Sequence, residues 1–184
     1  MMRLFVAVTP PPEVLDELRS ATAAMRSAHP ELRWSLPAQW HLTLAFLGGV
    51  DDETRMDLSA RLGRAAARHP PMRLALHGAG RFGDRVLWTR VAGDVGALGG
   101  LAASVRAAAR RAGVDVEDRP YRPHLTLARG RNGADLRPVV AALAGFAGRT
   151  WTAAELHLVR SHLGGGPGRT SRYELLASWP LTGS

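Results

Sequence analysis

Apolar and polar residues alternate in several short stretches of the chain, which is the pattern of a half-buried β-strand. The clearest case is 41–47, HLTLAFL, a strand that we expect to end at Gly48-Gly49. The predicted strands and extended pieces are residues 2–8, 32–35, 41–47, 72–79, 85–91, 122–128, 151–160 and 172–179. The fourth and fifth of these flank Phe82-Gly83-Asp84, a turn that predicts a hairpin.

Longer stretches carry apolar residues at helical spacing instead. In residues 13–28 these are Leu15, Leu18 and Met25, and the three prolines just before them mark a helix start. The predicted helices are residues 13–28, 52–68, 95–112 and 135–145. Short strands mixed with helices, together with a hairpin, favour antiparallel sheets and an α+β fold. No linker-like or low-complexity segment divides the chain, so we expect one domain over residues 1–184.

One pentapeptide, His-Leu-Thr-Leu-Ala, occurs at residues 41–45 and again at residues 124–128, one copy in each half of the chain. Successive strand residues point to opposite faces. The pattern therefore predicts one face with His41, Thr43 and Ala45, and an opposite face with Leu42, Leu44 and Phe46. In the second copy, the corresponding faces are His124, Thr126 and Ala128 against Leu125 and Leu127.

Two such units suit the cleavage of a phosphodiester. In-line displacement places the attacking and leaving oxygens on opposite sides of phosphorus, so one base and one acid must flank the phosphate. Imidazole serves in both roles because its pKa lies near neutrality, and threonine hydroxyls can donate hydrogen bonds to phosphate oxygens. The competing interpretation is that each histidine is structural and that the repeat reflects a composition rich in Leu and Ala.

Composition narrows the possible chemistry. The chain has no cysteine, which excludes thiol nucleophiles, thiolate metal sites and disulfides. All its basic side chains apart from histidine are arginines, which excludes a Schiff-base lysine and a Walker lysine. The net charge of +8 fits contact with a polyanion, or equally a coding bias that favours Arg over Lys. No segment resembles a signal peptide or a membrane span, so we expect a cytoplasmic protein with no membrane partner.

With these motifs the chain resembles the 2H phosphoesterases, whose hallmark is two HxTx motifs about half a chain apart. The resemblance is closest to RNA 2′,3′-cyclic phosphodiesterases, also called 2′-5′ RNA ligases, and covers nearly the whole chain. It rests on MRLFVAV, RWSLPAQWHLTLAFLG, FGDRVLW, PHLTLAR and SHLGGGPGRTSRYELLASWPL. It implies a single bilobal domain: two pseudo-symmetric antiparallel sheets, each backed by helices, with a central cleft and motifs at residues 41–44 and 124–127.

The resemblance also implies roles for individual residues. His41 would be the proton donor to the 3′ oxygen, and His124 would be the proton acceptor that activates water. Thr43 and Thr126 would contact the phosphate, and Arg129 matches a frequent phosphate-binding arginine. The substrate would be RNA ends bearing a 2′,3′-cyclic phosphate, tRNA fragments among them, and the product a 2′-phosphomonoester. Weak ATP-independent 2′-5′ RNA ligase activity, a monomer, no cofactor and no metal complete the expectation.

The aromatic residues near the two motifs allow two interpretations each. Trp34 and Tyr121 could stack on a nucleobase, or pack in the protein core. Phe46 occupies the position in the first copy that Arg129 occupies in the second, and by strand parity it should be a core residue. The tripeptide Ala38-Gln39-Trp40 departs from the acidic residue, Asn and Leu that are common before the first motif.

Other functions remain open at this level. The chain could be a 2H phosphodiesterase for a small cyclic nucleotide, because such an enzyme would share the chemistry and differ only in its cleft walls. It could be a non-catalytic RNA-binding module with a basic cleft. Metal binding by the two histidines is a further alternative, although two ligands fall short of the usual three or four.

Overall fold

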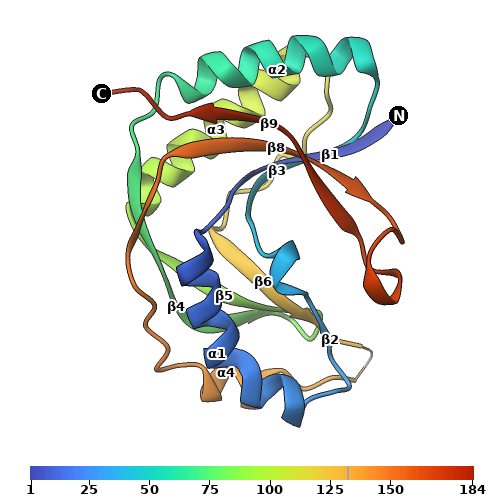
Figure 1. Ribbon diagram of the computed structural model, residues 1–184, viewed down its shortest axis with the longest axis vertical. Helices are drawn as coiled ribbons and strands as arrows, with labels where there is room; N and C mark the ends of the chain where they lie inside the picture. Colours follow the sequence, from blue (N-terminus) through green and yellow to red (C-terminus); the bar gives the residue numbers. More distant parts are fainter. Residues whose placement is uncertain (132) are drawn as a thin grey trace.

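The computed structural model describes residues 1–131 and 133–184. These residues form two antiparallel sheets and four α-helices (Figure 1). Sheet A has the strand order β3-β1-β8-β9, and sheet B has the order β2-β6-β5-β4-β7. The predicted α+β fold with two antiparallel sheets is confirmed.

The boundaries of the elements follow the predicted pattern closely. The strands of sheet A are β1 (Met2–Val8), β3 (Leu42–Val50), β8 (Glu155–His162) and β9 (Arg172–Pro180). The strands of sheet B are β2 (Arg33–Trp34), β4 (Met72–Phe82), β5 (Val86–Gly93), β6 (His124–Arg129) and β7 (Trp151–Ala153). The helices are α1 (Pro12–Ala28), α2 (Asp52–Ala66), α3 (Val95–Arg111) and α4 (Arg137–Ala142), with 3-10 turns at Pro37–Gln39 and Pro167–Arg169.

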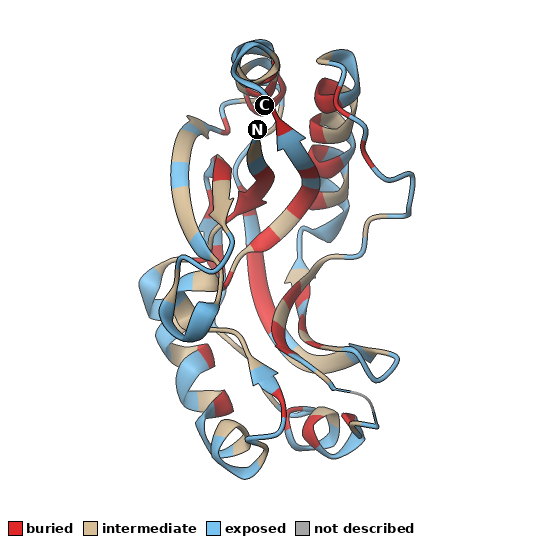
Figure 2. Ribbon diagram, turned by 90° about the vertical axis from the view of Figure 1, so that its right-hand side faces the viewer, coloured by how far each residue is buried: buried red, intermediate tan, exposed pale blue. Residues whose placement is uncertain are grey.

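Each sheet is backed by helices on one face. Helices α2 and α3 lie together over sheet A, where α2 contacts β8 and β9 and α3 contacts β3 (Figure 1). Helices α1 and α4 lie beside sheet B, where α4 contacts β4. The buried residues gather on the helix and strand surfaces that face each other (Figure 2). Burying a leucine such as Leu62 or Leu101 contributes about 1.5–3 kcal/mol to stability, so each sheet must keep its helix-facing side apolar.

Two predicted strand boundaries were wrong. Residues 151–160 were expected as one strand, but the chain breaks at Ala154, so that β7 joins sheet B and β8 joins sheet A. Alternation cannot reveal such a change of sheet, because both pieces are equally half-buried. Strand β3 also continues through Gly48-Gly49, since Gly48 takes a φ of +64° at a bulge and the pairing with β1 resumes beyond it.

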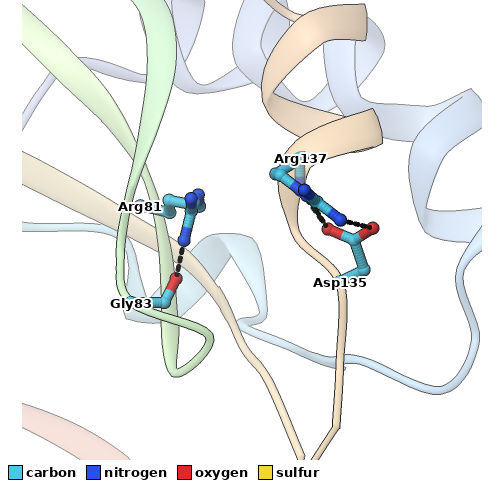
Figure 3. Close-up of polar contacts among 4 residues, drawn as sticks. All are labelled: Arg81, Gly83, Asp135 and Arg137. Carbon is cyan, nitrogen blue, oxygen red and sulfur yellow. Dashed lines mark hydrogen bonds and ion pairs between the residues drawn. The ribbon is translucent and has the colours of Figure 1, made fainter.

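Two arginines near the tip of the β4–β5 hairpin form hydrogen bonds within the protein. Arg137 binds the Asp135 carboxylate through two nitrogens at 2.9 and 3.0 Å, and Arg81 donates to the Gly83 carbonyl at 2.9 Å (Figure 3). The Arg137 hydrogen bonds lower the pKa of Asp135 to about 2, with a smaller contribution from the charge of Arg81. The ion pair anchors the start of α4, which is shorter than the predicted 135–145 helix.

Candidate active site

His41 lies immediately before β3, on the face of sheet A that points away from α2 and α3. We call this the inner face of sheet A. The His41 ring contacts two aromatic rings edge-on, with centroids 5.8 Å from Phe5 and 5.4 Å from Tyr173. Phe5 comes from β1 and Tyr173 from β9, so side chains of two strands hold the imidazole in place.

His124 begins β6 and has the equivalent setting in sheet B. Its ring lies 5.0 Å from Phe82 and 6.2 Å from Trp88, measured between centroids. Trp88 covers Gly80 so closely that a Cβ atom there would be 2.2 Å from the indole, so only glycine fits under this ring. We call this side of the sheet, with His124, Thr126 and Trp88, the inner face of sheet B.

Both copies of the repeat contain a β-bulge at the same position. In β3, Ala7 pairs with Thr43 but Val6 pairs with Ala45. In β6, Trp88 pairs with Thr126 but Leu87 pairs with Ala128. An extra residue after the threonine therefore shifts the side-chain alternation by one. The prediction that Ala45 and Ala128 share a face with the histidines was wrong: both are buried opposite core residues.

The same bulges decide where Phe46 and Arg129 point. Phe46 pairs with Phe5 and is 70% exposed, so the prediction that it is a core residue was also wrong. Arg129 pairs with Val86, which shares a face of β5 with Trp88, so Arg129 joins His124 and is exposed. One bulge thus adds an aromatic ring to the first inner face, and the other adds a cation to the second.

Arg129 connects the two inner faces. Burial lowers the pKa of His124 and the guanidinium charge of Arg129 adds to that effect, whereas burial raises the pKa of Tyr173 and the same charge opposes the rise; the Tyr173 ring contacts His41 in the other sheet. Strands β3 and β6 are in contact as well. The charge of Arg129 therefore acts on groups of both inner faces, and the two sheets meet where β3 contacts β6.

Burial sets the protonation of both histidines. It lowers the pKa of His41 and of His124 below 6.5, because an imidazolium loses solvation among aromatic rings. The Nδ1 atom of His124 is 2.6 Å from the Arg122 carbonyl. The Nδ1 of His41 lacks a hydrogen-bond partner among the described residues, although the nearby Gln39 carbonyl raises its pKa slightly against the effect of burial. With its Nδ1 on the Arg122 carbonyl, His124 has Nε2 left for a substrate.

Trp34 and Tyr121 lie elsewhere. Trp34 pairs with the buried Ala128, so it points away from the inner face, and its indole donates to the His29 carbonyl at 2.9 Å. Tyr121 packs against the core beside Arg106 of α3, and burial raises the pKa of its hydroxyl. Both side chains pack against the core, and Trp34 points away from the inner face of sheet B.

The sequence pattern did not reveal which aromatic residues surround the two histidines, or that a third histidine lies near them. Phe5, Tyr173, Phe82 and Trp88 surround the two rings, and only a knowledge of strand pairing could have brought them together. His157 of β8 lies in register with Ala7 and Thr43, and its charge lowers the pKa of His41. Within the described residues, no cluster of three or more His, Asp or Glu side chains could hold a metal ion.

These pKa shifts predict an acidic optimum. If one histidine acts as an acid and the other as a base, kcat/KM peaks midway between their pKa values in the free enzyme. Both lie below 6.5, so the maximum of kcat/KM is expected below pH 6.5. A bound phosphate anion raises both pKa values, so the maximum of kcat should lie at higher pH. Steady-state rates from pH 4.5 to 9 test this, and a kcat/KM maximum above pH 7 contradicts it.

Comparison with known proteins identifies the family. The protein-family model of the 2′-5′ RNA ligase superfamily matches residues 9–165 of this chain. The chain belongs to this superfamily. A curated relative from Escherichia coli (strain K12), an RNA 2′,3′-cyclic phosphodiesterase, is 34% identical over 98% of this chain and 97% of its own length. A relative of the same name from Geobacillus stearothermophilus is 30% identical over 98% of this chain, which spans only 57% of that protein.

Solved structures of this superfamily share the fold. The protein TT0787 of Thermus thermophilus superimposes with a TM-score of 0.81 at 32% identity, covering 100% of both chains. E. coli LigT complexed with 3′-AMP gives a TM-score of 0.72 at 28% identity and 98% coverage of both chains.

No helix in the described ranges is both long and apolar enough to span a membrane.

Proposed function

We propose that this protein is an RNA 2′,3′-cyclic phosphodiesterase that produces a 2′-phosphomonoester by acid–base catalysis. The observation that carries the proposal is the pair of half-buried imidazoles on the inner faces of two sheets that meet at β3 and β6, with the charge of Arg129 acting on both faces. The curated relatives from E. coli and Geobacillus carry the same activity in their names.

The reaction needs no group beyond these side chains. Nε2 of His124 takes a proton from water as its oxygen attacks phosphorus, and the bond from phosphorus to the 3′ oxygen breaks. His41, protonated at Nε2, gives its proton to that leaving oxygen. The product has a 2′-phosphate and a free 3′-hydroxyl, and the exchange of one proton with solvent at each ring restores the enzyme. In the same direction, a 5′-hydroxyl that attacks phosphorus in place of water forms a 2′-5′ phosphodiester as the 3′ oxygen leaves, which is weak ligation without ATP.

The other site residues bind the phosphate. Thr43 and Thr126 each follow a catalytic histidine by two residues and share its inner face, where they are partly exposed. Their hydroxyls donate hydrogen bonds to the non-bridging oxygens of the phosphate. Arg129 supplies positive charge where negative charge accumulates in the transition state. The five-membered ring of a cyclic phosphate is strained, and its opening releases that strain. Positioning of the phosphate and proton transfer therefore supply most of the rate enhancement that hydrolysis requires.

Phe46 provides a surface for the nucleobase next to the phosphate. The Phe46 ring contacts Phe5, with centroids 6.3 Å apart, but the residue is 70% exposed, so most of the ring faces solvent on the inner face of sheet A. Stacking on an aromatic ring contributes about 1–3 kcal/mol per base. Replacing Phe46 with alanine is therefore expected to raise KM for a nucleoside 2′,3′-cyclic phosphate about 10-fold, whereas Phe46→Tyr should retain the wild-type KM.

A matched control for this variant is Met56→Ala, which removes an equally exposed apolar side chain (69%) from α2. The readout is the KM ratio between a nucleoside cyclic phosphate and ribose 2′,3′-cyclic phosphate without a base. If Phe46→Ala weakens both substrates equally, the ring has a structural role and no stacking role.

The decisive experiment is to incubate the protein with an RNA oligomer ending in a 2′,3′-cyclic phosphate, in EDTA, and to identify the product. We expect complete conversion to the 2′-phosphate. Unchanged substrate with intact binding would favour an RNA-binding module, and conversion only without EDTA would favour a metal site. Turnover of mononucleotides but not oligomers would favour a small cyclic nucleotide. A monomeric state, tRNA fragments as substrate and a cytoplasmic location stay predictions from the sequence.

A further inference from the structure

A pocket of about 220 Å³ lies at the point where the chain passes from sheet B to sheet A. Its walls come from the end of β1, the start of α1, and the residues that join β7 to β8. The polar residues that line it are Thr9, Thr152, Glu155 and His157, and the apolar walls include Pro11 and Trp151. Since drug-sized ligands occupy roughly 300–1,000 Å³, this pocket suits a single sugar or base.

The pocket is next to the proposed catalytic region. His157 pairs with Ala7 of β1, and Ala7 pairs with Thr43 of β3, so the three residues form one row across the inner face of sheet A. Adjacent strands lie about 4.8 Å apart, which puts His157 about 9.6 Å from Thr43, measured between Cα atoms. The small side chain of Ala7 separates them. A strand of RNA whose cyclic phosphate lies at Thr43 can therefore reach the pocket with its next sugar.

Glu155 is held in place to accept hydrogen bonds in this pocket. Its carboxylate is 3.1 Å from Nε2 of His157 and 3.2 Å from the Ser178 hydroxyl, and the Thr9 hydroxyl is 2.9 Å from Nδ1 of His157. The Glu155 side chain is nevertheless 61% exposed, so its free lone pairs face solvent. A carboxylate repels phosphate, which excludes a phosphate group as the occupant. It binds hydroxyl groups well, as acidic residues do with the ribose of dinucleotides.

We infer that this pocket binds the ribose of the penultimate nucleotide, with Glu155 accepting a hydrogen bond from its 2′-hydroxyl and Pro11 and Trp151 packing on the sugar ring. The inference rests on the proposed function, because it takes the substrate to be RNA with its terminal phosphate between the two histidines. It adds a specificity that the catalytic residues do not provide: recognition of RNA over DNA one nucleotide before the cleaved phosphate.

The test uses dinucleotides that carry the product's terminal 2′-phosphate, so that binding is measured without turnover. One ligand has ribose at the penultimate position and the other has 2′-deoxyribose, and isothermal titration gives both dissociation constants. A hydrogen bond to a charged group predicts that the wild type binds the ribose form about 10-fold more tightly. In Glu155→Ala this ratio is expected to fall to about 1.

Glu31→Ala is the matched control, because Glu31 also contacts a histidine two residues away, His29, at 3.1 Å, but on the far side of sheet B from the catalytic region. It should keep the wild-type ratio. A second variant, Ala154→Leu, fills the pocket and should remove the advantage of the dinucleotide over a nucleoside 2′-phosphate. A wild-type ratio of 1, or a ratio unchanged in Glu155→Ala, overturns the inference.

Turnover of a 2′,3′-cyclic phosphate is measured separately on the same proteins. Turnover without ribose discrimination means that the pocket inference alone has failed. Discrimination without turnover means that the proposed function has failed while the ribose site stands.

Discussion

Replacing either His41 or His124 with alanine is expected to lower kcat/KM for a 2′,3′-cyclic phosphate by about 10²–10⁴-fold, because each proton transfer contributes that much. The double variant should lose less than the product of the two single losses, since residues that act together in one transition state are not additive. His29→Ala is the control, because that histidine contacts an exposed glutamate away from the site. Either single variant keeping more than a tenth of wild-type activity would contradict the assignment.

The leaving group can separate the acid from the base. When water attacks the phosphate of a nucleotide 4-nitrophenyl ester, the departing 4-nitrophenolate needs no proton. The loss of a general acid should therefore matter little for this substrate. We therefore expect His41→Ala to recover most of its deficit on the nitrophenyl ester and His124→Ala to recover none. The opposite outcome would exchange the two roles and leave the rest of the mechanism intact. This test is needed because the two histidines have nearly the same surroundings.

The same surroundings indicate that the two imidazoles do not serve to stabilise the fold. Each imidazole lies between two aromatic side chains, burial lowers its pKa, and Nδ1 of His124 is held by the Arg122 carbonyl. Burying a polar group among aromatic rings opposes stability unless it is hydrogen-bonded. A ring held in this way, with Nε2 left for another molecule, is arranged for proton transfer near the pH at which it titrates.

The sequence was sufficient for the elements and for the position of the two histidines. Periods of two and of three to four residues depend only on local geometry, so the strands and helices could be found without knowing what they pack against. The sequence was not sufficient to predict which residues of β3 and β6 share a face. Strict alternation placed Phe46 in the core and Ala45 beside His41, and both were wrong because pairing with β1 inserts a bulge.

Bulges and changes of sheet depend on neighbours far away in the chain. The break at Ala154 leaves the local pattern of residues 151–160 unchanged, yet it creates the pocket that Glu155 and His157 line. The contacts of His41 with Phe5 and Tyr173 depend likewise on the order of strands in sheet A. The repeat therefore revealed which residues carry the chemistry, and only strand pairing revealed what surrounds them.

Arg129 is the residue whose role depends most directly on a bulge. Removing a preorganised donor at the developing charge costs about 10²–10³-fold in kcat, and we expect Arg129→Ala to show a loss of that size. Arg129→Lys should recover part of it, because lysine keeps the charge and loses the bidentate geometry. Arg81→Ala is the control, since that guanidinium is bound to the Gly83 carbonyl at 2.9 Å (Figure 3).

The pH profile distinguishes this role from a structural one. The charge of Arg129 lowers the pKa of His124, so its removal raises that pKa. His124 must be neutral to accept a proton, and the acidic limb of kcat/KM should therefore move to higher pH in Arg129→Ala. Arg129→Lys retains the charge and should leave that limb in place while still reducing kcat. If both variants lose activity with unshifted profiles, the guanidinium does not lie where β6 directs it, and the phosphate must be held by other groups.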